Sequence, residues 1–239
     1  MAKNARGGET SYRWIRVPRQ ISRKESLENP LGWRDIPTPV LFHATDLHNL
    51  KSIQRTGLCP SSVTQIATWS ASDPQAIYVE TSPAQTFHWA GMPALLAILK
   101  ADVPRQCKAF LDWMLWVYDK PEEIAERGQA YALTDCGCIP PDRLWILTSE
   151  LGARRIKYRF KRLGDVVVPS FPTIGEDYDH SVFVSSEDAL AVDAIVKPFI
   201  RNYPHRPRVR WLAELFGVSE SEMTNMLERV TLYARKQVV

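Results

Sequence analysis

Hydrophobic positions along the chain occur both as short continuous runs and as evenly spaced single residues, which predicts a mixture of strands and helices. Residues 40–42 form an apolar run of the kind found in a buried strand. Apolar positions then repeat at a spacing of three from Leu47 to Ile53, which indicates one face of a short helix. Asp46 is placed to cap that helix, and Gly57 to end it in a left-handed conformation.

The rest of the chain continues this mixed pattern, so we expect an α+β fold. Apolar or alternating runs predict strands at residues 76–80, 93–103, 129–134, 144–148 and 156–160. Helical spacing predicts helices at 84–90, 105–127, 186–196 and 211–227. The second forms one helix or two, and the last is broken at Gly217. The last segment has helix-turn-helix spacing, but acidic Glu220 and Glu222 in its second helix favour a structural hairpin over a DNA reader.

Glycine, proline and charge divide the chain into three parts. Residues 1–38 are predicted to be a basic, weakly ordered N-terminal arm, 39–165 the core, and 166–239 a mostly helical C-terminal extension. Within the core, residues 59–74 are rich in small polar residues and have the length of a binding loop or lid.

Composition and charge limit the possible partners. The formal net charge is only +3, so binding to polyanions over the whole surface is not indicated, but residues 153–162 contain six basic residues and no acid. This run makes Arg154, Arg155, Lys157 and Arg159 candidates for contact with an RNA phosphate. No run approaches the roughly 20 apolar residues of a membrane helix.

The four cysteines are too few for a disulfide framework in 239 residues, and no apolar signal segment precedes them. We therefore expect reduced thiols in a cytoplasmic protein. Cys136 and Cys138 have no second pair at zinc-like spacing, so no metal site is predicted.

Two short motifs lie in the predicted core. The strand at residues 40–42 leads into His43 and Thr45, and Gly57 and Leu58 follow the helix. This arrangement resembles the first motif of the ADP-ribosyltransferase superfamily, in which a strand ends in His-x-Thr/Ser and leads into a helix closed by Gly-Leu. An Ile-Tyr-Val strand at 77–79, with Trp89 eleven positions after Tyr78, is similar to the second motif of its poly(ADP-ribose) polymerase-like members.

A third segment, residues 131–144, resembles the last strands of that superfamily. Its Leu133-Thr134-Asp135 and Pro140-Pro141 are also similar to the tRNA 2′-phosphotransferase branch. In all, the resemblance covers about residues 40–160. It implies a split β-sheet core with flanking helices, and NAD as a substrate. Residues 166–239 would add a C-terminal helical appendage to this core.

The resemblance also implies roles for particular residues. His43 would hydrogen-bond a ribose hydroxyl, Thr45 would hold the carboxamide, and Tyr78 and Trp89 would enclose the nicotinamide ring. Predicted catalytic residues are His43, Tyr78 and Gln129, and predicted NAD-binding residues are His43, Ala44, Thr45, Tyr78, Ser82 and Trp89.

One position departs from the family pattern. Active poly(ADP-ribose) polymerases have a glutamate immediately before the strand that matches Tyr131, and here that position is Ala130, with Gln129 ahead of it. Conceivable substitutes for the missing carboxylate are Glu80, Glu126, Asp135 and Glu150.

Three functions are consistent with this departure. The leading hypothesis is an NAD-dependent mono-ADP-ribosyltransferase of toxin or effector type, acting on a protein or nucleic acid in the cytoplasm or in the cytoplasm of a target cell. A second is an RNA 2′-phosphotransferase-like or RNA- or DNA-directed ADP-ribosyltransferase, and a third is a non-catalytic module that binds NAD or ADP-ribose.

Overall fold

The computed structural model describes residues 19–20, 36, 38–64, 73–86, 93–104, 106–111, 116–117, 128–151, 156–168, 186–202 and 209–227. The strands are β1 (Arg19–Gln20), β2 (Val40–Asp46), β3 (Ile77–Glu80), β4 (Pro93–Leu99), β5 (Lys108–Leu111), β6 (Trp116–Val117), β7 (Ala130–Thr134), β8 (Leu144–Leu151) and β9 (Ile156–Arg162). The α-helices are α2 (Leu47–Thr56), α3 (Ser61–Thr64), α4 (Pro83–Thr86), α6 (Ser186–Asn202) and α7 (Val209–Phe216). Residues 220–227 are also helical, and 3₁₀ turns occupy Lys100–Asp102, Pro141–Arg143 and Leu163–Asp165.

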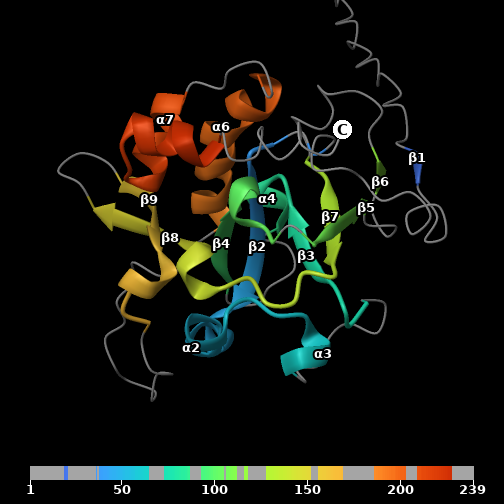
Figure 1. Cartoon of the computed structure of the whole chain (residues 1–239). Helices are drawn as coiled ribbons and strands as arrows, with labels where there is room; N and C mark the ends of the chain where they lie inside the picture. Colours follow the sequence, from blue (N-terminus) through green and yellow to red (C-terminus); the bar gives the residue numbers. More distant parts are fainter. Residues whose placement is uncertain are drawn as a thin grey trace, which may run out of the picture.

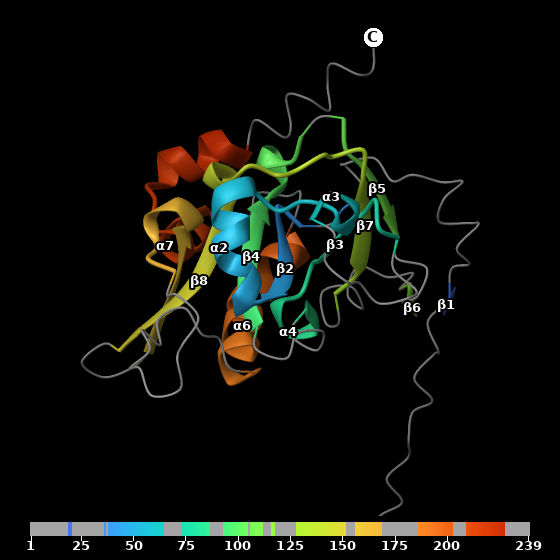
Figure 2. The same ribbon diagram turned by 90° about the horizontal axis from the view of Figure 1, so that it is seen from below.

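Seven of these strands form one sheet in the order β5-β7-β3-β2-β4-β8-β9, and every neighbouring pair is antiparallel. β1 pairs separately with β6. α2 lies on one side of the sheet, and α6 and α7 lie on the other (Figures 1 and 2). The α+β class predicted from the hydrophobic pattern is therefore confirmed.

The alternation of side chains along β2 divides the core into two clusters. Leu41 packs with Leu50 and Ile53 of α2 on one face of the sheet. Its neighbours Val40 and Phe42 point to the opposite face and pack with the C-terminal helices. The helices that the sequence assigned to an extension therefore share a hydrophobic core with the sheet.

The predicted helical hairpin near the C-terminus packs as a structural unit. Gly217 (φ 63°) separates α7 from the helix at 220–227. Phe216 stacks on Phe160 of β9 with ring centroids 5.0 Å apart, and contacts Trp145 edge-on.

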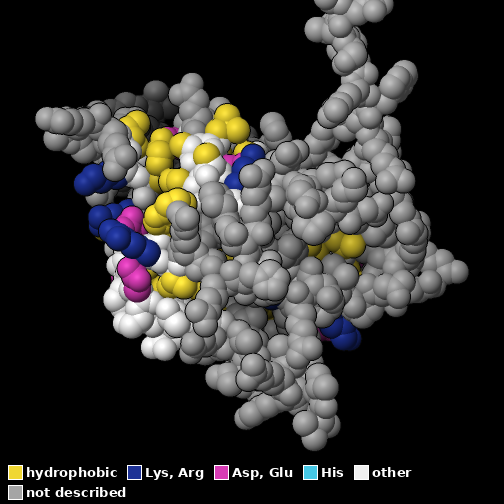
Figure 3. Space-filling model, turned by 90° about the horizontal axis from the view of Figure 1, so that it is seen from above, with side chains coloured by type: hydrophobic (Ala, Val, Ile, Leu, Met, Phe, Trp, Pro, Cys, Tyr) yellow, Lys and Arg dark blue, Asp and Glu magenta, His cyan; other side chains and the backbone are white. Residues whose placement is uncertain are grey.

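Hydrophobic side chains also gather on the outer surface over α6 and α7 (Figure 3). Leu190 of α6 and Trp211 of α7 are 60% and 40% exposed.

Three local predictions need correction. The helix expected at 105–127 is wrong where the structure describes it, because residues 108–111 form β5 and pair with β7. Asp46 occupies the N-cap position of α2, but its side chain makes no capping hydrogen bond. Gly57 ends α2 with φ 88° and ψ 176°, which is not the left-handed helical region but an extended conformation reserved for glycine.

The prediction of four reduced cysteines is also wrong, because the structure pairs Cys59 with Cys138 and Cys107 with Cys136. The backbone bridge Leu58↔Ile139 brings the first pair together across 79 residues of sequence. The second pair flanks the strand pair β5–β7. Because disulfides persist mainly in oxidising compartments, this pairing weighs against the cytoplasmic location expected from the sequence.

Breaking the Cys59–Cys138 disulfide is expected to lower the free energy of unfolding by about 2–4 kcal/mol, since it closes a long loop. Urea denaturation of a Cys59→Ser/Cys138→Ser variant measures this loss. Cys107→Ser/Cys136→Ser is the matched control, with a smaller loss because its loop spans 29 residues. Alkylation of all four thiols in the native, unreduced protein would contradict both pairings.

The last residues of the predicted arm pack against the core. Ile36 and Thr38, at the end of the predicted arm, are fully buried, and the Lys100 ammonium donates to the Ile36 carbonyl. Among the helices that the structure describes, none is long and apolar enough to cross a membrane.

Candidate functional site

The sheet is nearly divided between β2 and β3. β2 pairs with β4 along its whole length, and β3 does the same with β7. β2 and β3, in contrast, share the single pair Phe42↔Glu80. The half-sheets β5-β7-β3 and β2-β4-β8-β9 therefore meet at one point, which we call the junction.

His43 is the first residue of β2 beyond the junction. Its Nδ1 lies 2.7 Å from the backbone oxygen of Tyr78 on β3. Because a carbonyl oxygen only accepts hydrogen bonds, this contact assigns the proton to Nδ1 and leaves Nε2 of the neutral ring as an acceptor. The imidazole thus joins the two strands where their backbone pairing stops.

Burial controls the charge of this ring. His43 is partly buried, and the reduced hydration of its ring lowers its pKa below the ordinary value of 6.5, while the hydrogen bond to the Tyr78 carbonyl opposes that shift only in part. The ring is therefore neutral at pH 7. In this form it can accept a hydrogen bond from a hydroxyl group of a ligand.

Thr45 lies two residues beyond His43, and their side chains share one face of β2, with Ala44 on the other. Thr45 is buried, and its hydroxyl accepts a hydrogen bond from the Asn49 amide at 3.3 Å. Asn49 was not singled out from the sequence, although its place in the first turn after the strand was a usable signal. This contact holds the end of β2 against the start of α2.

Tyr78 is partly buried on β3, and its hydroxyl accepts a hydrogen bond from the backbone N–H of Asp73 at 2.6 Å. This hydrogen bond attaches the turn before β3 to the side chain of Tyr78. Trp89, the other member of the predicted aromatic pair, falls in a segment that the structure does not describe, so this pairing stays a prediction.

Gln129 joins the start of β7 to the end of β3. Its backbone N–H donates to the Thr81 hydroxyl at 2.8 Å, and its carbonyl accepts from the Thr81 N–H at 2.9 Å. The buried side-chain oxygen accepts from the Tyr131 hydroxyl at 2.7 Å. The contacts described for Gln129 hold the start of β7 against the end of β3, beside the junction. Its catalytic role stays a prediction.

Ser82 is likewise engaged by the protein. Its hydroxyl donates to the Asp193 carboxylate of α6 at 2.8 Å, and Asp193 also forms an ion pair with Lys197. Ser82 thus connects the residues that follow β3 to a helix far away in sequence. Asp193 had no signal in the sequence beyond its place in a predicted helix.

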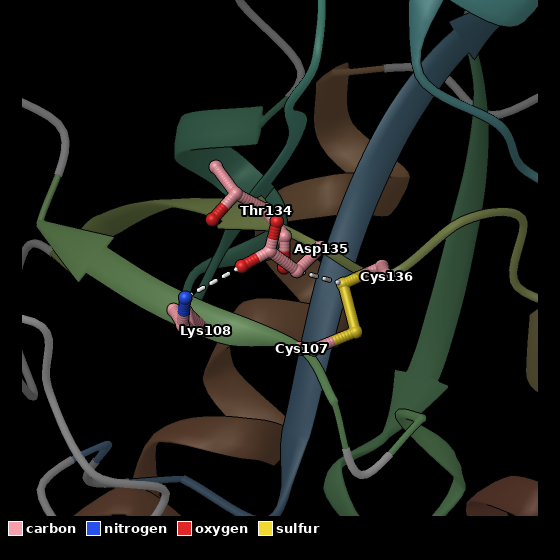
Figure 4. A network of polar contacts seen from close by, with 5 residues as sticks. All are labelled: Cys107, Lys108, Thr134, Asp135 and Cys136. Atoms are coloured by element: carbon pink, nitrogen blue, oxygen red, sulfur yellow. Dashed lines mark hydrogen bonds and ion pairs between the residues drawn. A yellow bond between two sulfur atoms is a disulfide. The ribbon is translucent and has the colours of Figure 1, made fainter.

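The four carboxylates considered as substitutes for the missing glutamate lie in different parts of the fold. Glu80 on β3 lies directly opposite Ala130 on β7. Asp135 lies five residues after Ala130, just beyond the end of β7. There its carboxylate is more than half exposed and binds the Lys108 ammonium at 2.8 Å (Figure 4). Glu126 lies outside the described ranges, and the structure places only the backbone of Glu150.

The predicted RNA-contact residues lie far from the junction in the strand order. Lys157 and Arg159 are exposed and point to one face of the edge strand β9, together with Lys161. Arg154 and Arg155 belong to a stretch for which the structure gives no description.

No family model, no curated protein and no solved structure matches this chain. In the part of the chain that is described, no group of three or more histidine, cysteine or acidic side chains could hold a metal ion. The site is therefore defined by its own geometry: a neutral histidine at a split in the sheet, with Thr45, Tyr78 and Glu80 on the strands that border it.

Proposed function

We propose that the protein is an NAD-dependent mono-ADP-ribosyltransferase, of toxin or effector type, that modifies a macromolecular acceptor. The observation that carries this proposal is the hydrogen bond from His43 Nδ1 to the Tyr78 carbonyl at the junction. It brings together the two motifs whose sequences resemble those of ADP-ribosyltransferases, and it presents Nε2 as an acceptor for a ribose hydroxyl.

The reaction suits a site of this kind. Cleavage of the bond between nicotinamide and ribose leaves a positively charged, oxocarbenium-like sugar, which the protein must orient and stabilise. In the proposed complex His43 holds the ribose, Thr45 and the backbone of Ala44 hold the carboxamide, and Tyr78 packs on the nicotinamide ring.

A second candidate function uses the same site with an RNA acceptor. The exposed Lys157 and Arg159 on β9 favour it, because regularly spaced cations attract a phosphate backbone. In that case the protein acts as an RNA 2′-phosphotransferase or an RNA-directed ADP-ribosyltransferase.

Incubation with adenylate-labelled NAD and a cell lysate tests the proposal. We expect nicotinamide release together with label on macromolecules, and digestion with protease or nuclease then identifies the acceptor class. Loss of phosphate from a 2′-phosphorylated RNA would favour the second candidate. NAD binding without nicotinamide release would instead identify a non-catalytic module and contradict the transferase.

A further inference from the structure

The edge strand β9 carries a line of cations outside the junction. Lys157, Arg159 and Lys161 alternate with the other residues of the strand, and all three are exposed. Phe160, between the last two, points the other way and packs with the C-terminal helices. The three cations therefore lie on the opposite side of the sheet, with successive residues about 6.6 Å apart at the rise of a strand.

Strand register places this line on the same side of the sheet as His43. Leu96 of β4 is the direct neighbour of His43, and Ile146 of β8 is the direct neighbour of Leu96. Lys161 of β9 is in turn the neighbour of Ile146. Because directly paired residues share a face, one row of side chains leads from the imidazole to the line of cations. The row crosses three strand spacings, about 14 Å in all.

Helix α2 extends this positive surface on the same side of the sheet. Gln54 Nε2 donates to the backbone oxygens of Leu163 and Val166, each at 2.8 Å, which holds the helix against the turn that follows β9. The exposed Lys51 and Arg55 lie one helical turn apart, and Lys51 shares its face of the helix with Gln54. Neither α2 nor β9 contains an acidic residue. We call the following residues the cationic flank: Lys51, Arg55, Lys157, Arg159 and Lys161.

The C-terminal helices on the other side of the sheet expose the opposite charge. α7 and the helix at 220–227 expose Glu214, Glu220 and Glu222. Arg210, an exposed cation of α7, is ion-paired with Glu214. Evenly spaced cations without interleaved acids attract a polymer with regularly repeating negative charge, and the phosphate backbone of a nucleic acid is such a polymer. The charge of the cationic flank therefore fits a nucleic-acid strand.

We propose that the cationic flank binds a strand of nucleic acid and that this strand is the acceptor of the transferase; the second part rests on the proposed function. A bound strand has to span only about 14 Å to bring one of its nucleotides from β9 to His43. A nucleophilic oxygen or nitrogen of that nucleotide bonds to C1′ of the ribose. Neutral nicotinamide leaves with the electron pair of the broken bond, and the proton of the nucleophile passes to water.

Lys157→Gln/Arg159→Gln tests the surface. Binding of fluorescein-labelled single-stranded RNA or DNA of mixed sequence is measured by anisotropy over a range of salt concentrations. We expect the affinity at low salt to fall about tenfold. The slope of log K against log salt should become shallower by about 1.4, since each phosphate contact to a single strand contributes about 0.7. Nicotinamide release without nucleic acid should stay at the wild-type rate, because the two cations lie far from His43.

Lys108→Gln/Arg210→Gln is the matched control. It removes the same charge from two exposed ion pairs, on β5 and α7, and should bind RNA and DNA as the wild type does. If Lys157→Gln/Arg159→Gln also binds with unchanged affinity and salt slope, the inference is overturned, and these cations only protect the sheet edge from pairing with another strand. Binding of polyglutamate as tight as that of RNA would overturn it in favour of an acidic polypeptide.

The outcomes separate this inference from the proposed function. A wild-type protein that binds RNA or DNA through the flank but releases no nicotinamide from NAD defeats the transferase and leaves the binding surface in place. A wild type that releases nicotinamide but labels only protein, to the same extent as Lys157→Gln/Arg159→Gln, overturns the assignment of the acceptor. Label on RNA alone or on DNA alone identifies which nucleic acid is the acceptor and supports the inference.

Discussion

Replacing His43 with asparagine is expected to reduce nicotinamide release from NAD by about 100-fold or more. The asparagine amide can still donate to the Tyr78 carbonyl, as Nδ1 of His43 does. It offers no acceptor where Nε2 stands, so the ribose hydroxyl loses its partner. Release is measured by chromatography at saturating NAD, and folding by circular dichroism.

His48→Asn is the control for this experiment, since His48 lies on α2 and has no part in the proposed site. It should keep the wild-type rate. A His43→Asn variant that folds and still releases nicotinamide at the wild-type rate would show that the imidazole only joins the two strands.

The pH dependence of stability and of activity provides a second test of His43. Its pKa is lowered in the folded protein, so between that value and 6.5 the unfolded chain binds a proton that the folded protein does not. Stability is therefore unaffected by this group above pH 6.5 and declines as the pH falls below 6.5, by at most about 1.4 kcal/mol per pH unit. His43→Asn should remove this part of the acid sensitivity, and activity should persist until the pH falls below the lowered pKa.

Replacing Gly57 with alanine is expected to lower the free energy of unfolding by about 3–5 kcal/mol. A Cβ at this position would overlap the carbonyl oxygen of Ile139 and lie 3.1 Å from its carbonyl carbon. The segments around Gly57 and Ile139 would have to separate, which breaks both hydrogen bonds of the Leu58↔Ile139 bridge. The positive φ of 88° adds backbone strain for any residue with a Cβ.

Gly217→Ala separates the two causes. Gly217 also has a positive φ, of 63°, but nothing lies within 4 Å of a Cβ built there. We expect a loss of only about 1–2 kcal/mol, from strain alone. Thermal and urea denaturation of the two variants provide the comparison, and equal losses would contradict the close approach of residues 57 and 139.

The sequence alone was enough to predict most regular elements of the described fold. Strands β2, β3, β4, β7, β8 and β9 and helices α2, α6 and α7 follow its apolar periodicity, because in these segments the buried face and the local backbone preference agree. The sequence-based prediction failed at β5 (Lys108–Leu111), because Phe110 and the following Trp113 and Trp116 have helical spacing in the sequence. Pairing with β7 decided that segment, and local spacing does not contain this information.

For the candidate site, the sequence determined which side chains are available: His43 and Thr45 at the end of a strand, Tyr78 on the next strand, and Ala130 where a carboxylate was expected. Only the tertiary structure decided which of them meet. It set the register that places Glu80 opposite Ala130, the contact between His43 and the Tyr78 carbonyl, and the pairing of all four cysteines. The physical reason is that these contacts join residues 29 to 79 positions apart, through strand register and close backbone approach, whereas local periodicity reports only on neighbours along the chain.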